Sequence, residues 1–180
     1  MEVVKSVRIE KGAVVVNGME DFTFDAGEFK PFAKAMYKHY EIDYAKFYKM
    51  SPLSKLGFLA SEILLSEMDL SGTDPDQVAL FIANSSSSLH TDNIYQETLD
   101  HTPSPAIFVY TLPNILVGEI CIRNGFKGDG VFFVQENFDK AFLFEYAGNH
   151  LKKSQSAMCL AGWVDMDFDG SYLADLFLLK

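Results

Sequence analysis

Short apolar runs alternate along the chain with segments in which apolar residues recur at helical spacing. Five runs predict the strands of one sheet, at Val3–Ile9, Val78–Ala83, Val131–Val134, Ala157–Val164 and Ser171–Leu179. The run Val78–Ala83 is wholly apolar, which is typical of a strand buried on both faces of a sheet. A further β-branched run, Ala13–Val16, follows the turn Glu10-Lys11-Gly12 and predicts a strand joined to the first one.

Helical spacing predicts the segments between these strands. The four predicted helices are Glu28–Tyr40, Ser51–Met68, Pro113–Arg123 and Phe138–Leu151. Ser51 suits the N-cap of the second helix, Pro52 suits its first turn, and Gly125 suits a left-handed stop after the third. Helices that alternate with apolar strands predict an α/β layered fold. Residues 1–180 show neither a linker nor a repeat, so we expect one domain.

The segment between Val134 and Phe138 predicts a sharp junction between a strand and a helix. N–H groups at a helix start favour an anion, and enzymes often place a nucleophile there. This junction holds Gln135, Glu136 and Asn137 instead, an amide, a carboxylate and a second amide.

Composition limits the classes of function. The chain is 48% hydrophobic and 14% aromatic, which predicts a folded protein with a sizeable core. No apolar run approaches the roughly 20 residues that span a membrane, and the N-terminus lacks a signal-peptide core. We therefore expect a cytoplasmic protein without a membrane partner. A net charge of −10 argues against nucleic acid as the main partner.

Basic residues are nevertheless concentrated in one segment. Five lysines lie within a stretch that contains only two acids, Glu41 and Asp43. The lysines are Lys34, Lys38, Lys46, Lys49 and Lys55. This cluster is a candidate docking site for an acidic partner such as an acyl carrier protein, or it is simply a solvated lysine-rich face.

Several other motifs have ordinary structural interpretations. Ser85–Ser88 predicts a polar loop or helix cap, because no GxSxG frame surrounds it. Asp165–Gly170 matches the start of a calcium loop, but Leu176 replaces the final Glu, so a tight acidic turn is expected. Cys121 and Cys159 lie in apolar stretches and predict buried free thiols. No spacing of ligands predicts a metal site, and no motif predicts a cofactor.

Four stretches in this order resemble the N-terminal half of β-ketoacyl-acyl carrier protein synthases, which have the thiolase-like fold. They are FYKMSPLSKLGFLASEILL (47–65), DQVALFIANSSS (76–87), SPAIFVYTLPNILVGEICIRNGFKGDG (104–130) and AMCLAGWVDM (157–166). The third is the most specific, with Pro-Asn, an apolar helix with a central Gly, then Ile-Arg, Gly and Lys-Gly. The resemblance covers nearly the whole chain but only half of a ketosynthase.

The resemblance implies a particular fold class. It is an α/β thiolase-like half-domain, with a mixed five-stranded sheet in the order 3-2-1-4-5 and helices on both faces. The fifth strand runs antiparallel to the others. In the family, two such halves form five αβαβα layers.

The resemblance also implies where a nucleophile would lie. In the family, Lys-Gly precedes a strand and then the catalytic Cys. Counting without gaps from Lys127-Gly128 places that position on Asn137. An amide cannot form a thioester, although Asn is a good N-cap, so we expect Asn137 to cap the helix and not to react. The family's two catalytic histidines lie in its C-terminal half. His39, His90, His101 and His150 match neither of those motifs, so no catalytic residue is predicted.

These expectations lead to a hypothesis of a non-catalytic, ketosynthase-like partner or regulatory subunit of an acyl-chain-building synthase. The pathway would be of the fatty acid, polyketide or aryl-polyene type, and chain-length-factor subunits offer the analogy. Two alternatives are an acyl-thioester binding module and a 3-oxoacyl-acyl carrier protein synthase activity completed by another chain.

The helix after the junction has apolar residues on several sides, including Leu143, Phe144, Tyr146 and Leu151. One sheet cannot bury them all, and the preceding strand is the expected sheet edge. We therefore expect a homodimer, or a heterodimer with a full-length ketosynthase. The candidate interface residues are Val131, Phe132, Phe133, Val134, Phe138 and Phe142.

Overall fold

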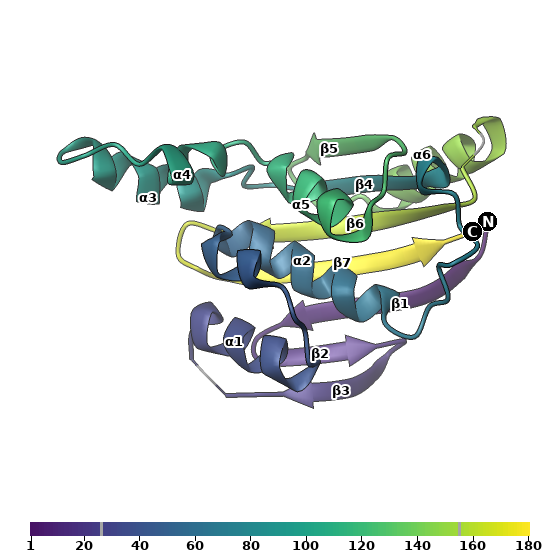
Figure 1. Cartoon of the computed structure of the whole chain (residues 1–180), viewed down its shortest axis with the longest axis horizontal. Helices are drawn as coiled ribbons and strands as arrows, with labels where there is room; N and C mark the ends of the chain where they lie inside the picture. Colours follow the sequence, from purple (N-terminus) through teal and green to yellow (C-terminus); the bar gives the residue numbers. More distant parts are fainter. Residues whose placement is uncertain (26, 155) are drawn as a thin grey trace.

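The computed structural model describes residues 1–25, 27–154 and 156–180. One mixed sheet of seven strands runs through it in the order β3-β2-β1-β7-β6-β4-β5 (Figure 1). The strands are β1 (Val3–Glu10), β2 (Ala13–Val16), β3 (Met19–Thr23), β4 (Val78–Asn84), β5 (Gly130–Val134), β6 (Met158–Met166) and β7 (Tyr172–Leu179).

Helices cover both faces of this sheet, as predicted. They are α1 (Phe29–His39), α2 (Pro52–Leu65), α3 (Leu89–Leu99), α4 (Pro105–Val109), α5 (Ile115–Asn124) and α6 (Lys140–Lys153), with short 3-10 turns η1 (Ala45–Lys49) and η2 (Pro75–Gln77). Helices α1, α2 and α5 pack on one face, and α6 packs on the other. The fold therefore has three layers.

The protein has two hydrophobic cores, one on each face of the sheet. Side chains alternate between the two faces along each strand, so neighbouring residues belong to different cores. In β4, Leu80 and Ile82 belong to the core under α2, whereas Phe81 and Ala83 belong to the core under α6. Every residue of β4 is buried, which confirms the interpretation of its wholly apolar run. Two of the predicted helix ends are also confirmed: the Ser51 hydroxyl accepts a hydrogen bond from the Ser54 N–H, and Gly125 has φ 72°.

The predicted strand order is wrong. The five expected strands are β1, β4, β5, β6 and β7, and their observed order is 3-2-4-5-1, extended by β2 and β3. The fifth, β7, is antiparallel to both neighbours, as expected. Strand β1 carries Arg8 and Glu10 on the face opposite to that of its buried residues Val7 and Ile9. This alternation suits a strand with one wetter face, which is why β1 lies outside the doubly covered centre of the sheet.

Helices α3 and α4 form an arm that no sequence pattern had predicted. Figure 1 shows the arm projecting beyond the end of the sheet. Thr91 is the only buried residue described in α3, and none is buried in α4. Tyr110 ties the base of the arm to the body, because its hydroxyl donates to the buried Glu119 of α5 at 2.8 Å. Burial, and after it this hydrogen bond, raise the pKa of Tyr110.

Candidate functional site

The junction between β5 and α6 is held at the carboxyl end of the sheet. Strand β5 pairs in parallel with β4, and the Gln135 N–H continues the ladder by donating to the Asn84 carbonyl at 2.8 Å. Beside it, Asp165 at the end of β6 accepts hydrogen bonds from the backbone of Ser85 and Ser86. The serine loop is thus fixed by a neighbouring strand, in agreement with a structural role.

The prediction that Asn137 caps the helix is wrong. Helix α6 begins at Lys140, and its N-cap is Asp139, whose Oδ1 accepts from the Phe142 N–H at 2.9 Å. Asn137 lies two residues earlier and is exposed. An ionised carboxylate is favoured at a helix start, and Asp caps as well as Asn, so the helix begins at the later residue.

Exchange of the two residues for alanine should separate their roles. We expect Asp139→Ala to lower the free energy of unfolding by about 1 kcal/mol, because the capped N–H loses its partner. Asn137→Ala should change it by less than about 0.5 kcal/mol, as expected for an exposed residue outside the helix. Denaturant unfolding of both variants measures this, and an equal loss in both would contradict the assignment of the cap.

Neither cysteine lies at this junction. Cys159 is fully buried within β6, and burial raises the pKa of its thiol. Cys121 is half-buried in α5, and burial raises its pKa as well. Both thiols are therefore held in the protonated form, which is a poor nucleophile.

An apolar surface adjoins the junction instead. Strand β5 forms one edge of the sheet, with β4 as its only partner among the described residues. Its Val134 is 58% exposed. Phe142 and Tyr146 of α6 are also exposed, and both rings pack against Phe133, with centroid distances of 5.4 Å and 5.1 Å. The free strand edge and the aromatic face of α6 are thus continuous.

The other predicted interface residues are more deeply engaged within the chain. Phe132 packs against the core under α2, and Val131 packs against the core under α6. Phe138 lies beside the Trp163 ring at 5.4 Å. We define the β5/α6 surface as Phe133, Val134, Phe142 and Tyr146. Tyr146 is the member that the candidate set had missed, although it follows the predicted Phe142 by one helical turn.

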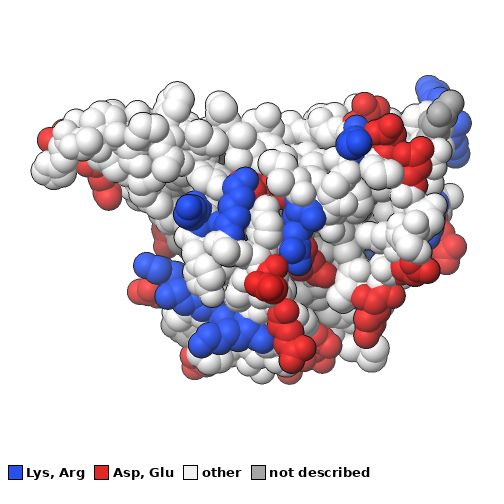
Figure 2. Space-filling view, in the orientation of Figure 1, with Lys and Arg blue, Asp and Glu red and all other residues white. Residues whose placement is uncertain are grey.

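The five lysines of the predicted cluster lie on α1, η1 and α2. Figure 2 shows basic side chains over α1 and beside α2, with acidic side chains directly next to some of them. Two members are engaged by the chain itself: Lys46 lies 2.9 Å from Glu119, and the Lys55 ammonium donates to the Met50 carbonyl at 2.7 Å. Lys34, Lys38 and Lys49 are exposed.

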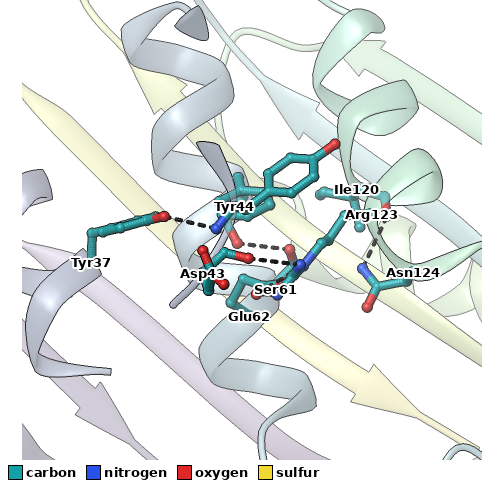
Figure 3. Close-up of polar contacts among 9 residues, drawn as sticks. Tyr37, Asp43, Tyr44, Ser61, Glu62, Ile120, Arg123 and Asn124 are labelled. Carbon is teal, nitrogen blue, oxygen red and sulfur yellow. Dashed lines mark hydrogen bonds and ion pairs between the residues drawn. The ribbon is translucent and has the colours of Figure 1, made fainter. Parts of the chain in front are cut away.

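A separate polar network joins α2 to α5 (Figure 3). Arg123 of α5 donates to both carboxylate oxygens of Glu62 in α2 and to the backbone carbonyl of Asp43. Its guanidinium also lies over the Tyr44 ring, 5.0 Å from the centroid. The hydrogen bond to Glu62 raises the pKa of Arg123. Because every group has a partner, we assign this network to structure.

The acidic segment after β6 forms the expected tight turn. The Asp167 N–H donates to the Ser171 carbonyl at 2.9 Å, and Gly170 has φ 85°. Within residues 1–25, 27–154 and 156–180, no cluster of three His, Cys, Asp or Glu side chains could hold a metal ion. None of the helices in these ranges is long and apolar enough to cross a membrane.

Comparison with known proteins gives matches at the level of structure alone. No family model and no curated protein matches the sequence. Many solved structures match the chain, and each of the three that follow covers 99% of it. The first is the ketosynthase ApeO in complex with its chain length factor ApeC from Xenorhabdus doucetiae, at TM-score 0.64 and 14% identity, over 78% of the matched chain.

The second is the ishigamide ketosynthase/chain length factor, at TM-score 0.69 and 14% identity, over 61% of its chain. The third is a type II polyketide synthase acyl-carrier protein in complex with its ketosynthase, AntDE:AntF, at TM-score 0.64 and 15% identity, over 62% of its chain. The chain thus spans about three-fifths of the matched chain in the second and third structures. At these identities the likeness is one of architecture, and the predicted resemblance is confirmed there: the chain has the fold seen in ketosynthase and chain length factor structures.

Proposed function

We propose that this chain is a non-catalytic, ketosynthase-like subunit that binds an acyl-chain-building β-ketoacyl synthase through the β5/α6 surface. The observation that carries the proposal is the continuity of a free strand edge with exposed aromatic side chains. A strand edge offers unpaired N–H and C=O groups to a second strand, and Phe133 and Val134 provide apolar contact beside it. Charged residues or proline would protect such an edge, and β5 contains neither.

The chemistry of the junction supports a non-catalytic role. The polar side chains between β5 and α6 are amides and carboxylates, and both thiols lie elsewhere, within secondary structure. Two of the matched structures contain a ketosynthase with a chain length factor. By analogy, we propose a synthase of the fatty acid, polyketide or aryl-polyene type as the partner, with a homodimer through the same surface as the alternative.

The exposed lysines Lys34, Lys38 and Lys49 extend this proposal. They provide positive charge for an acidic protein on a chain that is itself acidic overall. One matched structure holds an acyl-carrier protein with its ketosynthase. We propose that these lysines contact the carrier protein that serves the partner synthase. High salt should weaken that contact, whereas the β5/α6 contact should persist.

Affinity purification from the source cell tests the main proposal. We expect mass spectrometry to identify a β-ketoacyl synthase that carries a catalytic cysteine, bound to the wild-type chain. Phe133→Lys should abolish this capture if strand pairing dominates, because it buries a charge at the edge. Phe142→Glu should abolish it if the helix face dominates. Lys152→Glu, on the exposed C-terminal turn of α6, is the control and should retain the partner.

Three outcomes of this experiment would count against binding of a synthase through the β5/α6 surface. A wild-type chain that captures no synthase and scatters light as a 20.2 kDa monomer would overturn the proposal. Capture that survives both Phe133→Lys and Phe142→Glu would place the contact on another surface. A stable homodimer that both variants dissociate would favour the alternative.

The absence of a nucleophile at the junction gives a chemical prediction. Incubation with an acyl-CoA or with an epoxide directed at ketosynthase cysteines should leave the intact mass of this chain unchanged. The reason is that Asn137 cannot form a thioester and both thiols are held protonated by burial. A stoichiometric adduct mapped to residues 135–139 would favour the enzymatic alternative.

A further inference from the structure

The arm leaves large apolar side chains uncovered along both of its helices. Leu89 and Leu99 of α3 are exposed, and so are Phe108 and Val109 of α4. Phe108 is 53% exposed even though its ring packs against Tyr95 of α3, with 5.4 Å between the centroids. The two helices therefore cover each other only in part, and the remaining apolar surface is available to a partner.

Apart from its histidines, the arm carries charge of one sign. Its charged side chains are Asp92, Glu97 and Asp100, and the chain has no lysine or arginine between Lys55 and Arg123. None of the three acids forms an ion pair within the part of the chain that the structure describes. The side of the arm seen in Figure 2 is accordingly uncharged or acidic. A partner for this surface should combine positive charge with apolar contact.

The same chain carries a surface of that kind. Lys34 and Lys38 of α1 and Lys49 of η1 are exposed, and none of them forms an ion pair with a described carboxylate. Tyr48 precedes Lys49 and is 57% exposed, and its ring packs against Tyr37 of α1 at a centroid distance of 5.4 Å. This packing brings η1 and α1 side by side. We define the lysine face as Lys34, Lys38, Tyr48 and Lys49.

The lysine face and the arm are neighbours on the molecule. Lys49 lines the cleft at the base of the arm together with Ile107 and Tyr110. The rest of the arm projects away from the body (Figure 1), so it leaves the lysines of its own chain uncovered. Two complementary surfaces that adjoin on one chain suit a two-fold axis, because each can meet its complement on a second copy and every contact is made twice.

We propose that two copies of this chain form a symmetric dimer in which the arm of each lies on the lysine face of the other. The acids of α3 pair with the lysines of the second copy, and apolar side chains of the arm pack on its Tyr48. This contact is distinct from the β5/α6 surface and does not depend on the proposed function. It would cover the lysines that the proposed function gives to a carrier protein, so self-association and carrier binding should exclude each other.

Light scattering of the whole chain at low and high salt gives the first test. At low salt and micromolar concentration we expect a dimer, twice the 20.2 kDa of one chain. At about 0.5 M salt, where charges are screened within about 4 Å, the dissociation constant should rise at least tenfold. Phe133→Lys should leave the dimer intact, because that residue lies on the β5/α6 surface. A monomer at low salt, or a dimer that Phe133→Lys dissociates, would overturn the proposal.

Charge reversal provides the sharper test, because the two surfaces can be reversed separately. The arm variant is Glu97→Lys with Asp100→Lys, and the face variant is Lys34→Glu with Lys38→Glu. Each alone should be monomeric at low salt, since like charges then meet at both contacts. An equimolar mixture should form a one-to-one dimer, because the reversed arm meets the reversed face and the native arm meets the native face. Dimerisation of the mixture also shows that both variants are folded.

Glu67→Lys with Asp76→Lys is the matched control, because it changes the net charge by the same amount as the arm variant. Both residues are exposed and lie between α2 and β4, at the end of the sheet opposite to the arm (Figure 1). This control should dimerise like the wild type. Its dissociation would mean that net charge alone governs self-association. A mixture of folded arm and face variants that stays monomeric would mean that the two surfaces do not meet. Either result would overturn the proposal.

Discussion

Gly162→Ala should cost at least about 3 kcal/mol of folding free energy, the largest loss that we expect from any single methyl group in this chain. Gly162 lies in the middle of β6, opposite Ile82 on one side and Leu176 on the other. A Cβ atom at this position would overlap the Asp175 carbonyl and lie 2.8 Å from the Leu176 Cα. Both are backbone atoms held in the sheet, so they cannot move aside as a side chain could.

Gly118→Ala is the matched control, because it makes the same chemical change in the interior of α5. No atom lies within 4 Å of a Cβ added there. Alanine also favours the helix over glycine, so this variant should gain about 0.5–1 kcal/mol. Denaturant unfolding followed by circular dichroism measures both. If Gly162→Ala unfolded at the wild-type midpoint, the close approach of β6 and β7 would be refuted.

Lys46→Met should lower the free energy of unfolding by about 2 kcal/mol. The Lys46 ammonium lies 2.9 Å from Oε2 of Glu119, a carboxylate that is only 4% exposed. Methionine keeps the apolar stem but leaves this buried carboxylate with the Tyr110 hydroxyl alone. Removing one partner of a buried ion pair typically costs about 3–5 kcal/mol of folding free energy. We expect a smaller loss here, because the Lys46 side chain is 42% exposed and water screens its charge.

Lys49→Met is the control, because it distinguishes the loss of the Lys46–Glu119 ion pair from a general effect of replacing a lysine. Lys49 lies on the same short turn, η1, and is exposed to solvent. Its replacement should change stability by less than about 0.5 kcal/mol. A second observation can be made on the same samples: Lys46→Met should make the arm more sensitive to proteolysis, because Glu119 also holds Tyr110 at its base. Equal unfolding midpoints for the two variants would contradict the role assigned to Glu119.

The centre of the molecule could be predicted from the sequence because its patterns are strong. The wholly apolar run of β4 and the capped start of α2 each have one good structural solution. Strand order depends on partners far apart in the chain, and the predicted order was wrong. The charged residues Arg8 and Glu10, which alternate with Val7 and Ile9 in β1, were the signal that this strand lies outside the doubly covered centre.

The arm and the junction were harder to predict for different reasons. Segment 89–109 has few buried residues, so its sequence lacks the regular apolar stripe by which helices are recognised. At the junction, both Asn137 and Asp139 are good capping residues. Local preference could not choose between them, and only the structure shows which one begins α6.

The two ends of the chain are joined side by side, which determines how the fold resists a pulling force. Glu2 and Lys180 exchange backbone hydrogen bonds of 2.6 Å and 3.1 Å, at the point where β1 starts and antiparallel β7 ends (Figure 1). A force that separates these ends acts across the ladder and loads one bond pair at a time. The sheet should therefore open like a zipper at low force in an optical trap. The same tension applied between residue 10 and residue 180 would instead shear β1 against β7, loading the whole ladder at once, and should require a higher force.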